Sequence, residues 1–194
     1  AGSFWAGISV DELQGTNAGF ATVTGPSVGG IFPAVQEADN NVGITGGIGG
    51  KLDGASMQLI GSYDVDQEEG AVRLIATAEI GPGTLGLAGV WASGANAYYA
   101  ESEWAIAAEY AIKATDRLTI TPGAQWFGNV ANRGVIVANG GSVIIANDFS
   151  NRDAWQAGIT LDYKITEGLA TKVAVNYYDE DGADTDQWNG FVRL

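Results

Sequence analysis

The chain has 194 residues, 23 of them Asp or Glu and 9 Lys or Arg, so its formal charge is −14, and it contains neither histidine nor cysteine. Without these two residue types there is no Ser-His-Asp triad, thiolate nucleophile, disulfide, or zinc site built on His or Cys. The excess of carboxylates argues against a nucleic-acid partner, because phosphate binding needs clustered Lys and Arg.

Membrane-spanning helices are not predicted. The longest charge-free runs, Leu13–Gln36 and Ile80–Ala100, are interrupted by Gly, Pro and polar residues, whereas a spanning helix needs about 20 mostly apolar residues. The first residues lack the basic start and apolar core of a signal peptide. We therefore expect a soluble protein, a mature exported protein, or a piece of one.

The apolar residues recur with a period of two, which is typical of β-strands. The first segment, for example, places Phe4, Ala6, Ile8 and Val10 on one face. Ten such segments follow one another: Phe4–Leu13, Val42–Leu52, Ser56–Val65, Ala71–Ile80, Leu85–Ala92, Glu103–Ile112, Leu118–Phe127, Trp155–Lys164, Leu169–Tyr178 and Trp188–Leu194.

Apart from Glu12 at the end of the first segment, the charged residues of the ten segments avoid the apolar register. Arg73 and Glu79, for example, alternate with Val72, Leu74 and Ile80. Because successive strand side chains point to opposite faces of a sheet, we predict one nearly charge-free apolar face and one polar face. A soluble protein exposing such an apolar face would aggregate, so this face must contact lipid or protein.

The connections between the segments alternate in length. Four are tight turns: Asp53–Ala55, Gly81–Thr84, Lys113–Arg117 and Thr166–Gly168. The others are mostly longer: 14–41, 66–70, 93–102, 128–154 and 179–187. In an up-and-down meander this order places the tight turns at one rim and the longer loops at the other, as in outer-membrane barrels. Ten residues at about 3.3 Å each, tilted by about 45°, span roughly 23 Å, close to the apolar band of such barrels.

We therefore predict an all-β fold, a transmembrane antiparallel up-and-down β-barrel. Residues 1–194 would form a single barrel domain or the C-terminal portion of one, with ten strands and long outer loops at 14–41 and 128–154. Within the second loop, Asn139-Gly140-Gly141 separates two apolar runs and predicts a small hairpin, either above the barrel or over its mouth. Aromatic residues near the segment ends predict a lipid-facing girdle: Trp91, Trp104, Tyr110, Trp126, Trp155, Tyr163, Tyr177 and Trp188.

The segment Trp155–Leu194 resembles the C-terminal strands of alphaproteobacterial outer-membrane porins. The resemblance rests on an acidic loop followed by Trp188-Asn189-Gly190-Phe191-Val192-Arg193-Leu194. It rests also on Gly46–Arg73, where strand, tight turn, strand, acidic loop and Arg-containing strand follow in the family's order. Members of this family are about twice as long and form trimers of 16-stranded barrels, and they end in a Phe where this chain has Leu194. The resemblance implies the C-terminal part of a general diffusion porin, located in the bacterial outer membrane.

Inward-facing charges are the first functional candidates. Rings of charge on a pore wall set the field that an ion crosses, whereas the plain alternative is that they only solvate a wet lumen. The net negative charge favours the passage of cations. The candidate pore-lining residues are Asp64, Arg73, Glu79, Glu103, Glu109, Asp162, Lys164, Lys172 and Arg193.

Neither a cofactor nor catalysis is predicted. Asp179, Asp181 and Asp184 supply carboxylates of the kind that bind Ca²⁺, but they lack the spacing of a calcium loop, and an ordinary solvated loop explains them. Glu103 and Glu109 lie six residues apart on one strand face, roughly 20 Å, which is too far for glycosidase chemistry. The expected partners are outer-membrane lipid and lipopolysaccharide, and two further copies of the chain in a homotrimer.

The sequence leaves several functions open. The first is a porin whose water-filled channel lets small hydrophilic solutes and ions diffuse passively. The second is a self-contained ten-stranded outer-membrane barrel with a structural, adhesive or narrow-channel role. A soluble β-sandwich that acts as a binding module is the third, and an outer-membrane enzyme is disfavoured by the lack of histidine.

Overall fold

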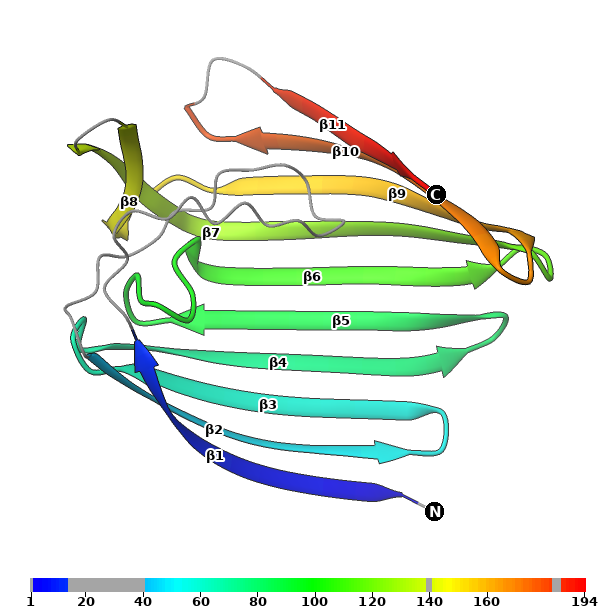
Figure 1. Ribbon diagram of the computed structural model, residues 1–194, viewed down its shortest axis with the longest axis horizontal. Coiled ribbons are helices and arrows are strands. Elements are labelled where there is room, and N and C mark those ends of the chain that lie inside the picture. The colour runs from blue at the N-terminus through cyan, green and yellow to red at the C-terminus, as the bar shows by residue number, and fades with distance from the viewer. Residues whose placement is uncertain (1, 14–40, 139–140, 183–185) are drawn as a thin grey trace.

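Eleven strands form the computed structural model, which describes residues 2–13, 41–138, 141–182 and 186–194 (Figure 1). Within these ranges, no helix has the length and apolar character needed to cross a bilayer. The strands are β1 (Ser3–Leu13), β2 (Asn41–Leu52), β3 (Ala55–Asp64), β4 (Glu69–Ile80), β5 (Gly83–Ala92), β6 (Ser102–Lys113), β7 (Leu118–Ala138), β8 (Gly141–Phe149), β9 (Ala154–Thr166), β10 (Leu169–Glu180) and β11 (Gln187–Arg193).

Ten of these strands form one antiparallel meander, in the order β1-β2-β3-β4-β5-β6-β7-β9-β10-β11. They match the ten predicted segments to within a few residues at the boundaries, except that β7 is longer. The segment 128–154, predicted as a long outer loop with a small hairpin, contains the end of β7 and all of β8, which pair from Ala131↔Phe149 to Ala138↔Gly141. Asn139 and Gly140 lie outside the described residues, as does nearly all of the predicted loop 14–41.

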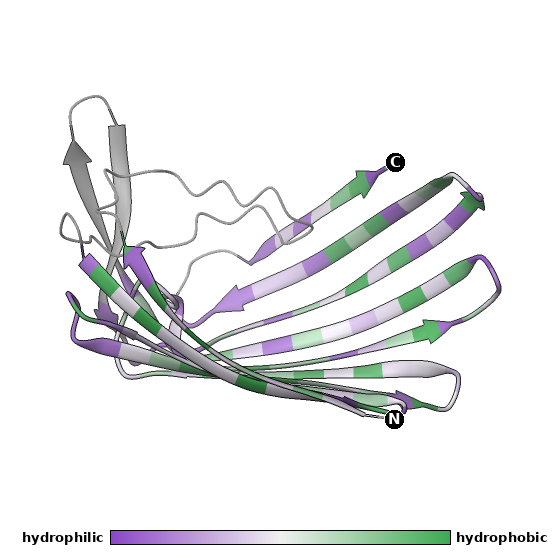
Figure 2. Cartoon of the chain, turned by 60° about the horizontal axis from the view of Figure 1, so that its bottom comes forward, coloured by the Kyte–Doolittle hydropathy of each residue, from purple (hydrophilic) through white to green (hydrophobic). Residues whose placement is uncertain are grey.

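Strand register aligns the apolar residues of neighbouring strands into rows. Ile48, Leu59 and Leu74 lie opposite one another on β2, β3 and β4. A second row joins Leu161, Val173 and Val192 across β9, β10 and β11. The period-two pattern of each strand therefore adds up to one continuous apolar face, and Figure 2 shows the alternation along the strands.

The two faces of the sheet differ in shape and are named here by register. The inner face carries the polar register and the outer face the apolar one. A hollow of about 360 Å³ extends from β4 to β10 and is lined mainly by inner-face residues such as Glu109, Gln125, Gln156 and Asn176. A hollow shared by so many neighbouring strands lies on the concave side of a curved sheet, so the inner face is concave (Figure 2).

The described strands do not close into a barrel. β1 and β11 form the two edges, and each pairs with a neighbour on one side only among the described residues. The meander is also a single layer rather than two stacked sheets, which contradicts the β-sandwich alternative. The structure thus confirms an antiparallel meander, whereas the predicted closure remains a prediction.

The two ends of the strands differ as the loop lengths predicted. At the end called here the turn rim, short connections join β2 to β3, β4 to β5, β6 to β7 and β9 to β10. Gly54 and Gly81 occupy left-handed conformations there, with φ of 71° and 56°, which glycine adopts without steric cost. The opposite end, called the loop rim, carries residues 65–68 and 93–101 and the β7–β8 hairpin (Figure 1).

The described part of the sheet has no large apolar core. Most of its large apolar side chains lie on the outer face and are exposed, Ile8 to 80% and Ile106 to 60%. Buried apolar residues are instead mostly small and lie near the loop rim, where Ala105, Phe127 and Ala154 occupy one inner-face row. The protein therefore buries its inner face at one end and leaves its outer face uncovered.

Candidate functional site

The inner face is the candidate site because it gathers the charged side chains of the strands. Register places the nine residues predicted to line a pore on this one face. They lie in three different environments, at the turn rim, midway along the strands, and at the loop rim. The residues are Asp64, Arg73, Glu79, Glu103, Glu109, Asp162, Lys164, Lys172 and Arg193.

Near the turn rim, three neighbouring strands carry charged side chains in direct succession, and a fourth charge follows beyond an intervening threonine. Lys172 of β10 lies between Asp162 of β9 and Arg193 of β11, and Asp162 lies opposite Thr119 of β7, whose other partner is Lys113 of β6. The Lys172 ammonium contacts an Asp162 carboxylate oxygen at 3.0 Å, with side chains that are 39% and 40% exposed. An ion pair this exposed contributes only about 0–1 kcal/mol to stability, so its charges remain available to solvent and solutes.

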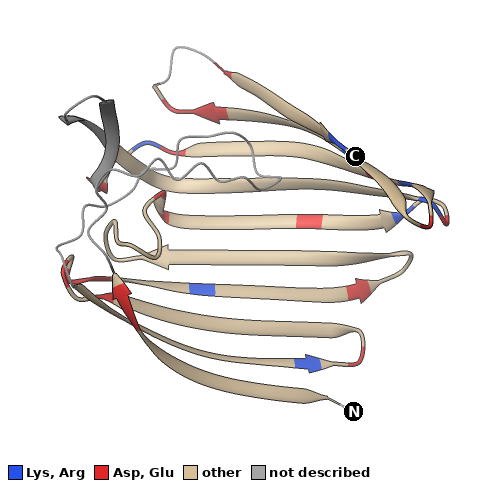
Figure 3. Ribbon diagram, viewed as in Figure 1, with Lys and Arg blue, Asp and Glu red and all other residues tan. Residues whose placement is uncertain are grey.

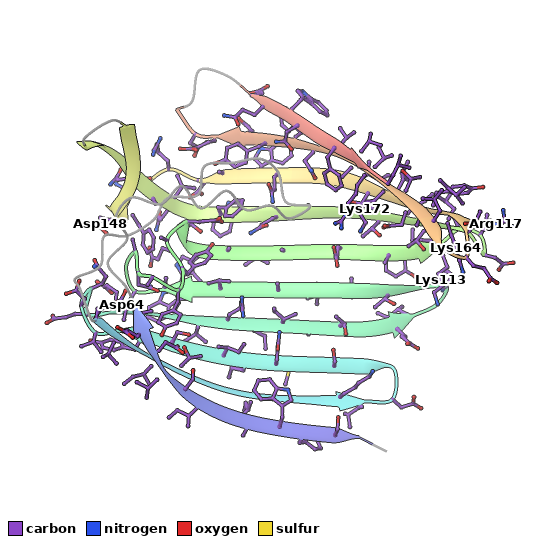
Figure 4. The ribbon with its side chains drawn as sticks, viewed as in Figure 1. Asp64, Lys113, Arg117, Asp148, Lys164 and Lys172 are labelled. Carbon is purple, nitrogen blue, oxygen red and sulfur yellow. The ribbon has the colours of Figure 1, made fainter. Side chains whose placement is uncertain are left out.

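Two further cations lie beside this row. Lys164 follows Asp162 by two residues on the inner face of β9, and its amide donates to the Arg117 carbonyl in the β6–β7 turn at 2.8 Å. Figure 4 shows Lys113, Arg117, Lys164 and Lys172 together at this end of the sheet. The sequence pattern predicts Lys164 and Lys172 at this site but does not reveal Lys113, the last residue of β6, or Arg117, which lies in a turn.

Midway along the strands the wall is lined by small residues. The Glu109 side chain lies against Gly86 on one side and Gly123 on the other, and a Cβ placed on Gly86 would lie 3.0 Å from the Glu109 Cγ. Together with neighbouring threonines and glutamines, these glycines form the hollow described above. Arg73 lies on the same face, between Ile60 and Val90 of the adjacent strands.

At the loop rim the two predicted residues are hydrogen-bonded to neighbouring groups, and they differ in burial, since Glu103 is partly exposed. Asp64 is fully buried, and its carboxylate accepts hydrogen bonds from the Asn41 side chain at 2.8 Å and from the Ala97 amide at 2.9 Å. Glu103 accepts from the Asn129 side chain at 2.6 Å. The prediction that Asp64 projects into open space is therefore wrong, because a connection folds over it.

That connection is the segment 93–101 between β5 and β6, called here the inner loop. Asn96, which is only 1% exposed, stabilises the turn of the inner loop. The side-chain oxygen of Asn96 accepts hydrogen bonds from the amides of Tyr98 and Tyr99, each at 3.0 Å. Burial is the main cause that raises the pKa of Tyr98, and it raises the pKa of Tyr99 to about 12. The sequence carries a signal of this, since 93–101 holds three alanines, two tyrosines and one charge, an unusual composition for a solvated loop.

Charge is distributed unevenly between the two rims. Among the described residues, fourteen Asp and Glu lie near the loop rim with only Arg133 and Arg152, whereas six of the nine Lys and Arg of the chain lie near the turn rim with five carboxylates. Figure 3 shows this separation along the strands. The described wall is therefore strongly acidic at one end and nearly balanced, with a slight positive excess, at the other.

The outer face carries the predicted aromatic girdle positions. Six of the eight lie near the loop rim, where Trp91 packs on Trp104 with ring centroids 6.2 Å apart, and Tyr177 packs between Trp155 and Trp188 at 5.1 and 5.0 Å. Tyr110 and Tyr163 lie toward the turn rim. Trp5, which the sequence pattern does not single out, lies on the inner face over Gly47 and Gly49.

The acidic loops do not form a cation site among the residues described. No group of three or more carboxylates able to hold a metal ion occurs in that part of the chain. Asp179 instead accepts from the Trp155 indole at 3.0 Å, and Asp181 accepts from the Asp153 amide at 3.3 Å. Asp184 lies outside the described residues.

Similar proteins place these features in a family. A sequence model described as "Porin subfamily" matches residues 1–191. The chain is 45% identical over 192 residues to "Outer membrane protein IIIA" of Rhizobium leguminosarum bv. viciae, which covers 95% of this chain and 47% of that protein. It is 40% identical over 195 residues to "Putative outer membrane protein y4fJ" of Sinorhizobium fredii (strain NBRC 101917 / NGR234), covering 100% and 47%. The chain thus spans about half the length of these curated relatives, and no solved structure matches it.

Proposed function

The chain belongs to the porin subfamily, a family of non-enzymatic outer-membrane channels, and from this membership we propose that it forms part of the wall of a water-filled channel. Small hydrophilic solutes and ions would diffuse through it down their gradients. The observation that carries the proposal is the division of the sheet into a charged, concave inner face and an exposed apolar outer face, on which the charged strand residues Glu12 and Asp179 lie only near the loop rim. Such a division suits a surface with water on one side and hydrocarbon on the other.

Closure of the wall is part of the proposal. Lipid offers no hydrogen-bond partners, so a strand edge inside a membrane must pair. The edges of β1 and β11 need such partners, and the chain spans only about half of its curated relatives. We propose that further strands complete a 16-stranded barrel, in keeping with the resemblance to general diffusion porins, and that the barrel assembles as a homotrimer in contact with lipid and lipopolysaccharide.

Cation preference is the finer part of the proposal. The acidic loop rim would concentrate cations at the mouth of the channel, because a lumen lined by one sign of charge attracts counter-ions. The cations Lys113, Lys164, Lys172 and Arg193 at the turn rim oppose this preference. We therefore expect a moderate selectivity that varies with ionic strength, since screening acts over about 10 Å at 0.1 M salt.

Planar-bilayer recordings of the whole barrel that contains this chain test the proposal. We expect steady ohmic conductance steps and, under a salt gradient, a reversal potential that indicates excess cation permeability. Swelling of proteoliposomes in small sugars would show passage of uncharged solutes. Absence of conductance from correctly folded barrels would contradict the channel, and a reversal potential of the opposite sign would contradict the cation preference alone.

A further inference from the structure

We propose that the inner loop, residues 93–101, narrows the channel near its loop rim, and that Asp64 is the positioning residue that holds it against the wall. This inference rests on the proposed channel function. It concerns a segment for which sequence analysis predicts only a connection at the outer rim.

The wall beneath the inner loop carries a row of carboxylates. Register aligns Asp11 of β1, Gly43 of β2, Asp64 of β3 and Glu69 of β4 as successive cross-strand neighbours on the inner face. Three acidic side chains therefore lie along a line perpendicular to the strands. Neighbouring strands are about 4.8 Å apart, so the row spans roughly 14 Å of the wall.

Each carboxylate of this row binds the inner loop. The Ser93 hydroxyl donates to Glu69, the Ala97 amide donates to Asp64 at 2.9 Å, and the Tyr98 hydroxyl donates to Asp11 at 2.8 Å. The loop thus leaves β5 and runs across β4, β3 and β2 to reach β1. A loop that only joined β5 to its neighbour β6 would have no need to contact β1.

Gly43 leaves the room that the loop needs between these carboxylates. A Cβ placed on Gly43 would lie 1.9 Å from the Tyr98 hydroxyl oxygen, a separation that no side chain permits. Asp64 has the central place, since it is fully buried and its other oxygen accepts from the amides of Asp66 and Gln67 at 3.1 and 3.2 Å. It therefore joins the β3–β4 turn and the inner loop in one hydrogen-bond network.

The position of the loop has two consequences for a channel. It covers the inner wall, since Ala71 and Ala92 beneath it are buried while Val72 and Trp91 on the outer face remain exposed. It also engages Asp11, Asp64 and Glu69, so that these carboxylates face the loop rather than the lumen. Release of the loop would widen the channel and uncover fixed negative charge together.

Two variants of the whole barrel test the proposal from opposite sides. Asp64→Asn places an amide nitrogen against one of the amide donors, and Gly43→Val displaces the Tyr98 hydroxyl without changing any charge. For both we expect higher single-channel conductance and passage of larger sugars, and for Gly43→Val also increased cation selectivity. Asp53→Asn, in the turn after β2 at the opposite rim, is the matched control and should leave both measurements as in the parent.

A second readout follows the loop itself. The chain has no cysteine, so Ala95→Cys, at a buried position of the inner loop, reports access to a polar thiol reagent. We expect protection of this thiol when Asp64 is present. With Asp64→Asn added we expect labelling that is roughly tenfold faster or more, because hydrogen bonds to a charged acceptor change an opening equilibrium by that order.

The outcomes separate this inference from the proposed function. Protection of the introduced thiol with no conductance from any barrel would contradict the channel, and with it the narrowing that rests on it. Rapid labelling of the Ala95→Cys single variant would overturn the placement of the loop. Addition of Asp64→Asn could instead speed labelling but leave the conductance and the sugar size limit unchanged. That outcome would overturn the proposal that the loop narrows the channel, because the loop would then only cover the wall at the loop rim.

Discussion

The two ends of the inner face obey the same strand alternation and yet present opposite surroundings. At the loop rim, Asp64 is buried and accepts a hydrogen bond from Ala97 of the inner loop, whose turn is closed by the buried Asn96. At the turn rim, Asp162 and Lys172 form an exposed pair. The comparison teaches that register decides which face a side chain takes, whereas the connection above it decides whether that side chain meets water.

The largest expected difference between the two ends comes from removing a carboxylate. Asp64→Ala removes the acceptor of four hydrogen bonds, from the Asn41 side chain and from the amides of Asp66, Gln67 and Ala97, and loss of the acceptor of a buried donor costs about 1–3 kcal/mol. Asp162→Ala should lower the free energy of unfolding by no more than about 1 kcal/mol. Urea unfolding of the barrel in detergent or lipid measures both, and equal losses would contradict the comparison.

The next largest difference in stability between the two ends is expected when a small inner-face side chain is replaced by a larger one. Ala92 is fully buried on the inner face near the loop rim, whereas Ala170 is exposed on the same face near the turn rim. We expect Ala92→Leu to destabilise the barrel by about 1–3 kcal/mol through overpacking, and Ala170→Leu to change stability by less than about 0.5 kcal/mol. Tolerance of leucine at position 92 in the same unfolding assay would show that the inner loop is not packed on the wall.

Alkaline pH should weaken the packing of the inner loop. The pKa of Tyr99 is raised by burial from 10.0 to about 12, so between these values the folded protein holds a proton that the unfolded chain has released. The stability from this group is complete below pH 10 and is lost as pH rises toward 12. Faster labelling of the Ala95→Cys thiol in this pH range, abolished by Tyr99→Phe, would check the effect. The labelling rate is compared with that of a free model thiol at each pH, and a ratio independent of pH would contradict the prediction.

The smallest effect is expected at the turn rim. Lys172→Ala breaks the exposed pair with Asp162 and should cost at most about 1 kcal/mol, a loss that salt reduces further by screening. The effect of Lys172→Ala on ion selectivity should be clearer than its effect on stability, because removal of a cation from the channel wall favours cations over anions in the lumen. Reversal potentials at low and high salt measure it, and a shift toward anions would contradict the placement of Lys172 on the channel wall.

Much of the fold and part of the candidate site could be predicted from single segments. The alternation of Val72, Leu74 and Ile80 with Arg73 and Glu79 assigns a face to each of these residues without knowledge of their neighbours. Lys113 and Arg117 could not be recognised as part of the basic end, since they lie at a strand end and in a turn, where the period-two pattern stops. Trp5 could not be placed either, because its position depends on the glycines of the neighbouring strand, Gly47 and Gly49.

The two faces of the sheet and its two rims follow from the amino-acid sequence alone, because side-chain direction in a strand and the length of a connection are local properties. Which inner carboxylates are covered depends instead on the folded chain. The bonds from Tyr98 to Asp11 and from Ala97 to Asp64 join residues 87 and 33 positions apart. Contacts at such separations depend on how five strands align side by side and on how the chain folds back across them, which no local pattern encodes.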